Sequence, residues 1–195
     1  MCRFQAKGVY EQPIMAGLEY AWRLDDDSRL LRPIDYDLFA YMRSNRFVYG
    51  VASTDGDWCV EGLWPAVDRY LTGRSDTLTP TFYSEWPRGR IYFNNFEVSS
   101  MALWTSPVYK DFIDYIDHLG GIYAFRWGDA AIKTIAVSLF VKKSDTHRFK
   151  YITYKHTWAL TLKLPLQYNR VWGKWYKPTD YFLVMPTDIF PMYKS

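Results

Sequence analysis

Residues 93–97 read Phe-Asn-Asn-Phe-Glu, residues 126–130 read Arg-Trp-Gly-Asp-Ala, and a helix-like segment lies between them. Each stretch places a carboxylate, Glu97 or Asp129, beside aromatic rings and hydrogen-bonding groups. Aromatic faces with polar tips suit the binding of an uncharged polar ring such as a sugar. Each stretch is therefore a candidate for a site that binds such a ring. Two plainer interpretations stay open, in which Glu97 is a strand-edge residue and Asp129 only caps a helix.

Helix signals follow both stretches. Ser106-Pro107 predicts a helix start, with Ser as the N-cap and Pro in the first turn, and Gly120-Gly121 predicts its end. Apolar residues at helical spacing predict one buried face made of Val108, Phe112, Tyr115, Ile116 and Leu119. A second helix is expected after Asp129, with a buried stripe of Ile132, Ile135, Ala136, Leu139 and Phe140.

The preceding part of the chain alternates between strand and helix patterns. Residues 19–24 and 47–52 predict strands, and the polar residues 53–57 are expected to end the second one. Residues 35–42 and 59–71 predict helices, residues 72–90 a loop, and the last 40 residues short strands and loops. This alternation indicates an α/β fold, and 195 residues are enough for the single domain, 1–195, that we expect.

Composition narrows the class of protein. The net charge of +3 comes without any run of basic residues, so we expect no nucleic-acid partner. The chain has no apolar run of about 18 residues, so we expect no transmembrane segment within it. The two cysteines, Cys2 and Cys59, could pair or stay free. Aromatic residues make up 19% of the chain, which fits either an aromatic core or an aromatic-lined cleft.

Three consecutive aspartates, Asp25-Asp26-Asp27, follow the first predicted strand. Carboxylates this close repel one another, which favours a bound cation or an open, solvated turn. Hard divalent ions prefer such oxygen ligands, and the neutral imidazole of His156 is a suitable ligand for manganese. Taken alone, an acidic turn and a single histidine are also compatible with an ordinary surface.

Together these motifs resemble the fungal α-1,2-mannosyltransferases of glycosyltransferase family 15. The resemblance runs nearly end to end, through motifs in the same order and at similar spacing. These are Met1 to Phe4, Tyr20 to Asp27, Asp35-Tyr36-Asp37, Asn95-Phe96-Glu97, Gly120-Gly121, Arg126 to Ala130, and Tyr154 with His156.

The resemblance implies a fold and an activity. The fold would be a GT-A-like mixed sheet with flanking helices, and the chain would lack the N-terminal nucleotide-binding βαβ half. The activity would be metal-dependent, retaining transfer of mannose from GDP-mannose to a mannosyl acceptor on a glycoprotein. The full-length protein would be membrane-anchored in the Golgi lumen.

The resemblance also implies site residues. Asp25, Asp27 and His156 would hold Mn²⁺, and Glu97 would be the catalytic carboxylate, acting as a nucleophile or as a stabiliser of charge. Substrate contacts are expected from Asn95, Arg126, Trp127 and Asp129. One departure is that Asp25-Asp26-Asp27 stands where the family has Glu-Pro-Asp, so the first carboxylate is one methylene shorter.

Two other functions remain open at this point. A truncated, non-catalytic carbohydrate-binding module, or pseudoenzyme, would keep the acceptor groove without turnover. A glycoside hydrolase would use Glu97 and Asp129 as its carboxylate pair and would need both to face one cleft.

Overall fold

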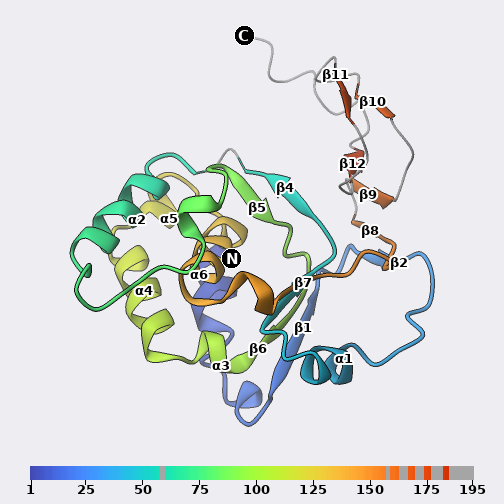
Figure 1. The fold of residues 1–195 in the computed structure, drawn as a ribbon, viewed down its shortest axis with the longest axis horizontal. Coiled ribbons are helices and arrows are strands. Elements are labelled where there is room, and N and C mark those ends of the chain that lie inside the picture. Colours follow the sequence, from blue (N-terminus) through green and yellow to red (C-terminus); the bar gives the residue numbers. More distant parts are fainter. Residues whose placement is uncertain (58–59, 157–158, 163–166, 170–173, 177–181, 185–195) are drawn as a thin grey trace.

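The computed structural model describes residues 1–57, 60–156, 159–162, 167–169, 174–176 and 182–184. At its centre lies a four-stranded sheet in the order β1-β6-β3-β7 (Figure 1). The strands are β1 (Tyr20–Leu24), β6 (Phe96–Ser100), β3 (Tyr49–Val51) and β7 (Thr146–Arg148). The first three pair antiparallel, and β3 pairs parallel with β7. The predicted mixed sheet is therefore confirmed.

Strand β6 lies between two hydrophobic clusters. Successive side chains of a strand point to opposite faces, so β6 faces both clusters. Phe96 and Val98 are buried in one cluster with Leu38 and Met42 of α1 (Leu38–Ser44). The side chain between them, that of Glu97, therefore points to the other face of the sheet.

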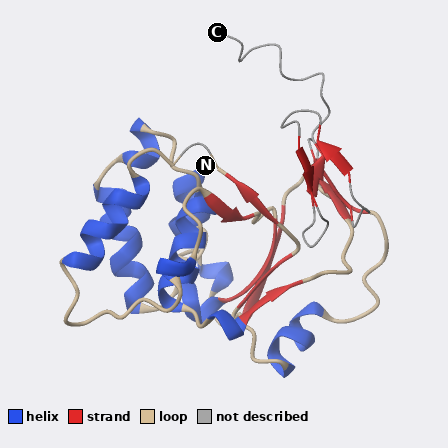
Figure 2. Cartoon of the chain, turned by 45° about the horizontal axis from the view of Figure 1, so that its top comes forward, coloured by secondary structure: helices blue, strands red, loops and turns tan. Residues whose placement is uncertain are grey.

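The remaining helices cover that other face, whereas α1 lies on the opposite side of the sheet (Figure 2). They are α2 (Leu63–Thr72), α3 (Met101–Trp104), α4 (Pro107–His118), α5 (Gly121–Ala124) and α6 (Asp129–Phe140). Their buried side chains form the larger core of the protein. Three of these helices, α3, α4 and α5, come from the segment that the two opening motifs enclose, whereas α2 precedes it and α6 follows it.

Helix α4 begins and ends where the sequence predicts, but its buried face is rotated. Ser106 caps its start by accepting a hydrogen bond from Tyr109 N at 3.2 Å. Val108 and Leu119 are 48% and 40% exposed, so their predicted burial is wrong. The buried stripe consists of Tyr109, Phe112, Ile113 and Ile116. These four keep the spacing of three and four residues that one helix face requires.

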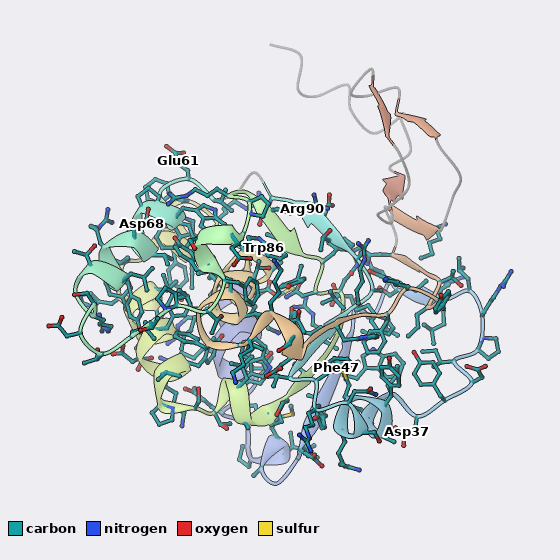
Figure 3. The ribbon with its side chains drawn as sticks, in the orientation of Figure 1. Asp37, Phe47, Glu61, Asp68, Trp86 and Arg90 are labelled. Atoms are coloured by element: carbon teal, nitrogen blue, oxygen red, sulfur yellow. The ribbon has the colours of Figure 1, made fainter. Side chains whose placement is uncertain are left out.

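Two other expectations change in the structure. Residues 53–57 do not simply end a strand, because β4 (Thr54–Gly56) pairs with β5 (Arg90–Tyr92) as a separate two-stranded sheet. The side chain of Trp86 stabilises the turn before β5 by donating to Arg90 O at 2.7 Å, and Figure 3 shows both residues there. Helix α2 begins at Leu63, after Gly62 with a φ of 72°, rather than at residue 59.

A second four-stranded sheet has the order β12-β9-β8-β2. Its strands are β2 (Arg29–Leu30), β8 (Tyr154–His156), β9 (Ala159–Leu162) and β12 (Phe182–Val184). A further hairpin pairs β10 (Gln167–Asn169) with β11 (Lys174–Tyr176). Short helical turns complete the described elements: Phe4–Gly8, Pro13–Met15, Tyr83–Glu85 and Lys143–Asp145.

The structure also bears on the length of the helices and on the cysteines. Within its described part, the longest helices are too short to cross a bilayer. Cys2 is a half-buried free cysteine, and Cys59 lies outside the described residues.

Candidate metal centre and its charged neighbours

Strand β1 delivers the acidic residues to the edge between the two sheets. Its last residue is Leu24, and Asp25 N then donates to Asn95 O at 3.1 Å. Ser28 N donates back to Asp25 O at 2.9 Å, which closes a tight turn. The turn directs Asp25 and Asp27 toward the end of β8, while Asp26 is exposed.

His156, the last residue of β8, completes the cluster. Its Nδ1 lies 2.7 Å from Asp27 Oδ1 and 3.3 Å from Ser28 Oγ. One ligand atom from each of Asp25, Asp27 and His156 lies within 4.8 Å of the others. The acidic turn and the distant His156, which the sequence predicts as metal ligands, are therefore adjacent in space.

The donor set fits a divalent cation. Two carboxylate oxygens and one imidazole nitrogen suit manganese and similar ions, which complete their coordination with water or phosphate oxygens. Asp27 is exposed, and the side chains of Asp25 and His156 are only half-buried. Solvent and a ligand can therefore reach the cluster from outside.

Arg23 connects this cluster to helix α6. Its Nε donates to Asp25 Oδ1 at 2.8 Å, and its Nη1 donates to Asp129 Oδ2. Burial disfavours the charged guanidinium, but the two carboxylates outweigh that cost and place the pKa of Arg23 above its ordinary value. Arg23 is thus a permanent cation held between a candidate metal ligand and a candidate substrate-binding residue.

Asp129 lies at the first turn of α6 but is not its N-cap, which is Gly128. Asp129 Oδ2 accepts from Arg23 and, at 2.8 Å, from Asn94 Nδ2. Both of these contacts use Oδ2, and the side chain is 14% exposed. Asp129 is therefore a fixed carboxylate that keeps a partly exposed edge near the metal cluster.

Glu97 occupies a different environment, inside the helical core. It is 2% exposed, and its oxygens accept from Tyr49 OH at 2.8 Å and from Ser99 Oγ at 3.2 Å. Its third partner is the ammonium group of Lys133, which is 1% exposed. The structure thus encloses Glu97 in a buried ion pair instead of opening it to a cleft. This burial argues against a hydrolase whose two carboxylates face one substrate.

Lys133 is not among the residues that the motifs predict, although the sequence carries a signal for it. Between Ala130 and Phe140, Lys133 is the one charged residue of a helix that is otherwise apolar or small. A helix that is hydrophobic all round is normally buried, and a buried lysine needs an anionic partner. Its position on α6, four residues after Asp129, could therefore have indicated the pair.

Two other predicted substrate contacts, Asn95 and Arg126, lie in different environments. Asn95 is 3% exposed, and its Oδ1 accepts from Tyr154 OH at 2.6 Å. Arg126 is exposed and has a left-handed backbone with a φ of 56°, which is unusual for a residue with a side chain.

Trp127 requires a correction to the predicted sugar contact. It is 3% exposed and donates from Nε1 to Glu61 O at 2.6 Å. Its ring packs so closely on Gly121 that a Cβ there would lie 2.5 Å from ring atoms. We therefore assign Trp127 to the core that supports the loop before Asp129 and leave it out of the proposed site.

An α/β fold with two aspartates and a histidine where its two four-stranded sheets meet defines a candidate metal centre of the kind that nucleotide-sugar transferases use. Comparison with known families agrees with this class. The model of the family described as glycolipid 2-alpha-mannosyltransferase matches residues 1–165, and the chain belongs to that family.

Relatives and solved structures support the same assignment. The chain is 33% identical to O-glycoside alpha-1,2-mannosyltransferase omh1 of Schizosaccharomyces pombe, over 80% of this chain and 43% of that protein. It is 30% identical to alpha-1,2 mannosyltransferase KTR1 of Saccharomyces cerevisiae, over 80% and 42%. The chain thus spans less than half the length of these relatives.

Two crystal structures share the fold. One is the S. cerevisiae mannosyltransferase Ktr4p in complex with GDP, with a TM-score of 0.75, 28% identity, and coverage of 82% of this chain and 45% of that one. The other is the Mn/GDP form of core-mannan synthase A from Aspergillus fumigatus, with a TM-score of 0.75, 24% identity, and coverage of 82% and 48%. The GT-A-like fold is therefore established for the matched part of the chain.

Proposed function

We propose that this protein acts in metal-dependent transfer of mannose from GDP-mannose to a mannosyl acceptor on a glycoprotein, with retention of configuration. The observation that carries the proposal is the convergence of Asp25, Asp27 and His156 on one point. The names of the relatives support it, since they are α-1,2-mannosyltransferases. We propose the Golgi lumen as the place of action of the complete, membrane-anchored protein.

Each residue has a proposed task. Asp25, Asp27 and His156 would hold Mn²⁺, which would neutralise the diphosphate that leaves the sugar. Asp129 would meet the mannosyl group, because its Oδ2 is held by Arg23 and Asn94 while its side chain reaches the surface. Arg126, which is exposed, would contact the ligand. Asn95 would stabilise the turn at Asp25, because its backbone oxygen accepts from Asp25 N.

The buried position of Glu97 changes the role that we propose for it. Its oxygens are engaged by Lys133, Tyr49 and Ser99, so attack on a sugar carbon would require breaking a core ion pair. We therefore propose that Glu97 stabilises the framework of the site from within the core. Asp129 would be the carboxylate nearer to the reacting centre.

Metal binding tests this proposal most directly. Mn²⁺ titration of the purified chain, followed by electron paramagnetic resonance, should give one specific site. Asp27→Asn and His156→Ala should each weaken binding by at least about tenfold, because each removes one of three protein ligands. Asp26→Asn is the matched control, since Asp26 shares the acidic turn but not the cluster, and it should bind as the wild type does.

Transfer activity tests the second half of the proposal. The chain is mixed with GDP-mannose, Mn²⁺ and α-mannosides, and mannosyl transfer is measured for the wild type and for Asp129→Asn. Loss of transfer in Asp129→Asn with unchanged Mn²⁺ affinity supports the assignment of Asp129. Mn²⁺ and mannoside binding without any transfer would instead indicate a carbohydrate-binding module.

A further inference from the structure

Two ion pairs of opposite polarity connect helix α6 to the central sheet. The helix supplies the anion of one pair and the cation of the other. Asp129 of α6 pairs with Arg23 of β1, and Lys133, one helical turn later, pairs with Glu97 of β6. Arg23 and Glu97 are direct partners across the antiparallel strands β1 and β6. Directly opposed side chains of such strands start about 5 Å apart and share one face of the sheet. Arg23 therefore has a third carboxylate, Glu97, as its cross-strand neighbour.

Glu97 has a complete set of hydrogen-bond donors without Arg23, and Lys133 supplies the positive charge among them. Its ammonium group contacts Glu97 Oε1 and lies 2.5 Å from Tyr10 OH and 4.7 Å from the ring centre of Trp104. With Tyr49 and Ser99 also donating to Glu97, both carboxylate oxygens are satisfied. Arg23 is then free to bridge Asp25 and Asp129.

Removing the charge of Lys133 would change this balance. A carboxylate at 2% exposure without a cationic partner is strongly disfavoured, because it has lost its hydration. In the part of the chain that the structure describes, the cation best placed to replace Lys133 is Arg23, directly across the strand pair. All three guanidinium nitrogens of Arg23 already donate to Asp25 or Asp129, so we expect that turning toward Glu97 costs at least one of these contacts.

We propose that Lys133 is a positioning residue for the metal centre, which keeps Glu97 from capturing Arg23. By pairing with Glu97, Lys133 reserves the guanidinium for Asp129 and for the metal-ligand carboxylate of Asp25. The pair thus sets the position of one positive charge beside the metal site without touching the metal or the substrate. This inference rests on the proposed function only in taking Asp25, Asp27 and His156 as metal ligands.

The proposal predicts an unusual direction for a core substitution. Arg23 Nε holds Asp25 Oδ1 at 2.8 Å and places a positive charge next to the ligands. Withdrawal of Arg23 frees that oxygen and removes a repulsive charge, so the cation should bind more tightly. One unit charge at such a range changes the affinity for a divalent ion by about tenfold even in a water-like dielectric. Damage to the core would act in the opposite direction, weakening the site.

The experiment compares Mn²⁺ affinity in three variants of the full chain. Lys133→Met should bind Mn²⁺ about tenfold more tightly than the wild type. Glu97→Gln/Lys133→Met should return to wild-type affinity, because the neutral amide no longer competes for Arg23. Lys110→Met, the same substitution at an exposed lysine of α4, should change nothing. A crystal structure of Lys133→Met should show the guanidinium of Arg23 on Glu97.

Several outcomes would overturn the proposal. Unchanged or weaker Mn²⁺ binding by folded Lys133→Met would do so, as would a crystal structure in which Arg23 stays on both Asp25 and Asp129. If Lys133→Met does not fold, Lys133→Gln removes the charge but keeps a hydrogen-bond donor for Glu97, and the same results are expected. If the wild-type chain itself binds no Mn²⁺, the proposed function fails, and the position of Arg23 in the variant crystal still decides this inference.

Discussion

At the scale of single residues, the environment of a side chain determines its chemistry more than its type does. Asp129 and Glu97 are both carboxylates in motifs that the sequence marks as candidate sites. Asp129 reaches the surface between Arg23 and Asn94, whereas Glu97 is sealed in the core with Lys133. One is suited to meet a ligand, and the other is suited to fix the framework.

His147 gives a prediction at this scale. Its ring stacks on Phe47, whose position Figure 3 shows, with ring centres 4.6 Å apart, and it meets Phe149 edge-on at 4.8 Å. Burial, together with Lys150, lowers the pKa of His147 below its ordinary value of 6.5. As pH falls through 6.5, the unfolded chain binds a proton that the folded chain resists, so acidification reduces stability.

His147→Phe should remove this acid-sensitive component and keep the ring stacking. Urea unfolding at about pH 7.5 and about pH 5.5 should show the wild type losing more stability than His147→Phe over this interval. Equal losses in the two proteins would contradict the assignment to His147. The matched control is His118→Phe, the same substitution at an exposed histidine at the end of α4, which should behave as the wild type does.

At the scale of elements, caps and glycines set where helices begin and end, and long-range packing sets which face is buried. The sequence predicts the Ser106 cap and the termination of α4 at Gly120, which has a φ of 70°. It does not predict the rotation of the buried stripe to include Tyr109, because adjacent stripes differ by a single position along a helix with many apolar residues.

Helix α5 gives the prediction at this scale. A Cβ on Gly121 would lie 2.5 Å from atoms of the Trp127 ring, which is itself enclosed. Gly121→Ala should therefore destabilise the protein by about 1–3 kcal/mol through overpacking. The control is Gly73→Ala, where a Cβ would meet backbone oxygens no closer than 3.7 Å and φ is −72°. Thermal unfolding of both variants tests the difference, and equal stability would contradict the packing argument.

At the scale of the whole molecule, the candidate metal centre lies where the two four-stranded sheets meet. Asp25 and Asp27 follow β1 of the central sheet, and His156 ends β8 of the second sheet. A bound cation would therefore connect elements that are far apart in sequence. Metal binding and stability should be linked for this reason.

This linkage can be measured by thermal unfolding. Mn²⁺ at a hundred times its Kd should stabilise the folded chain by about 2.7 kcal/mol, because it binds the folded form. Addition of a chelator should reverse the rise in Tm. Asp27→Asn, with at least about tenfold weaker binding, should gain no more than about 1.4 kcal/mol at the same concentration. A Tm that does not depend on Mn²⁺ in the wild type would show that the three ligands do not bind the ion together.

The sequence by itself determined the family and the three candidate metal ligands, because the motifs that carry them occur in a fixed order along the chain. It also determined the mixed α/β fold, because helix signals are local. Only the tertiary structure decided which motif residues are buried in the core and which reach the surface. Trp127 and Glu97 carry no local mark that separates a site residue from a core residue. Their burial, and the pairing of Glu97 with Lys133 rather than Arg23, depends on strand register and helix packing between distant segments.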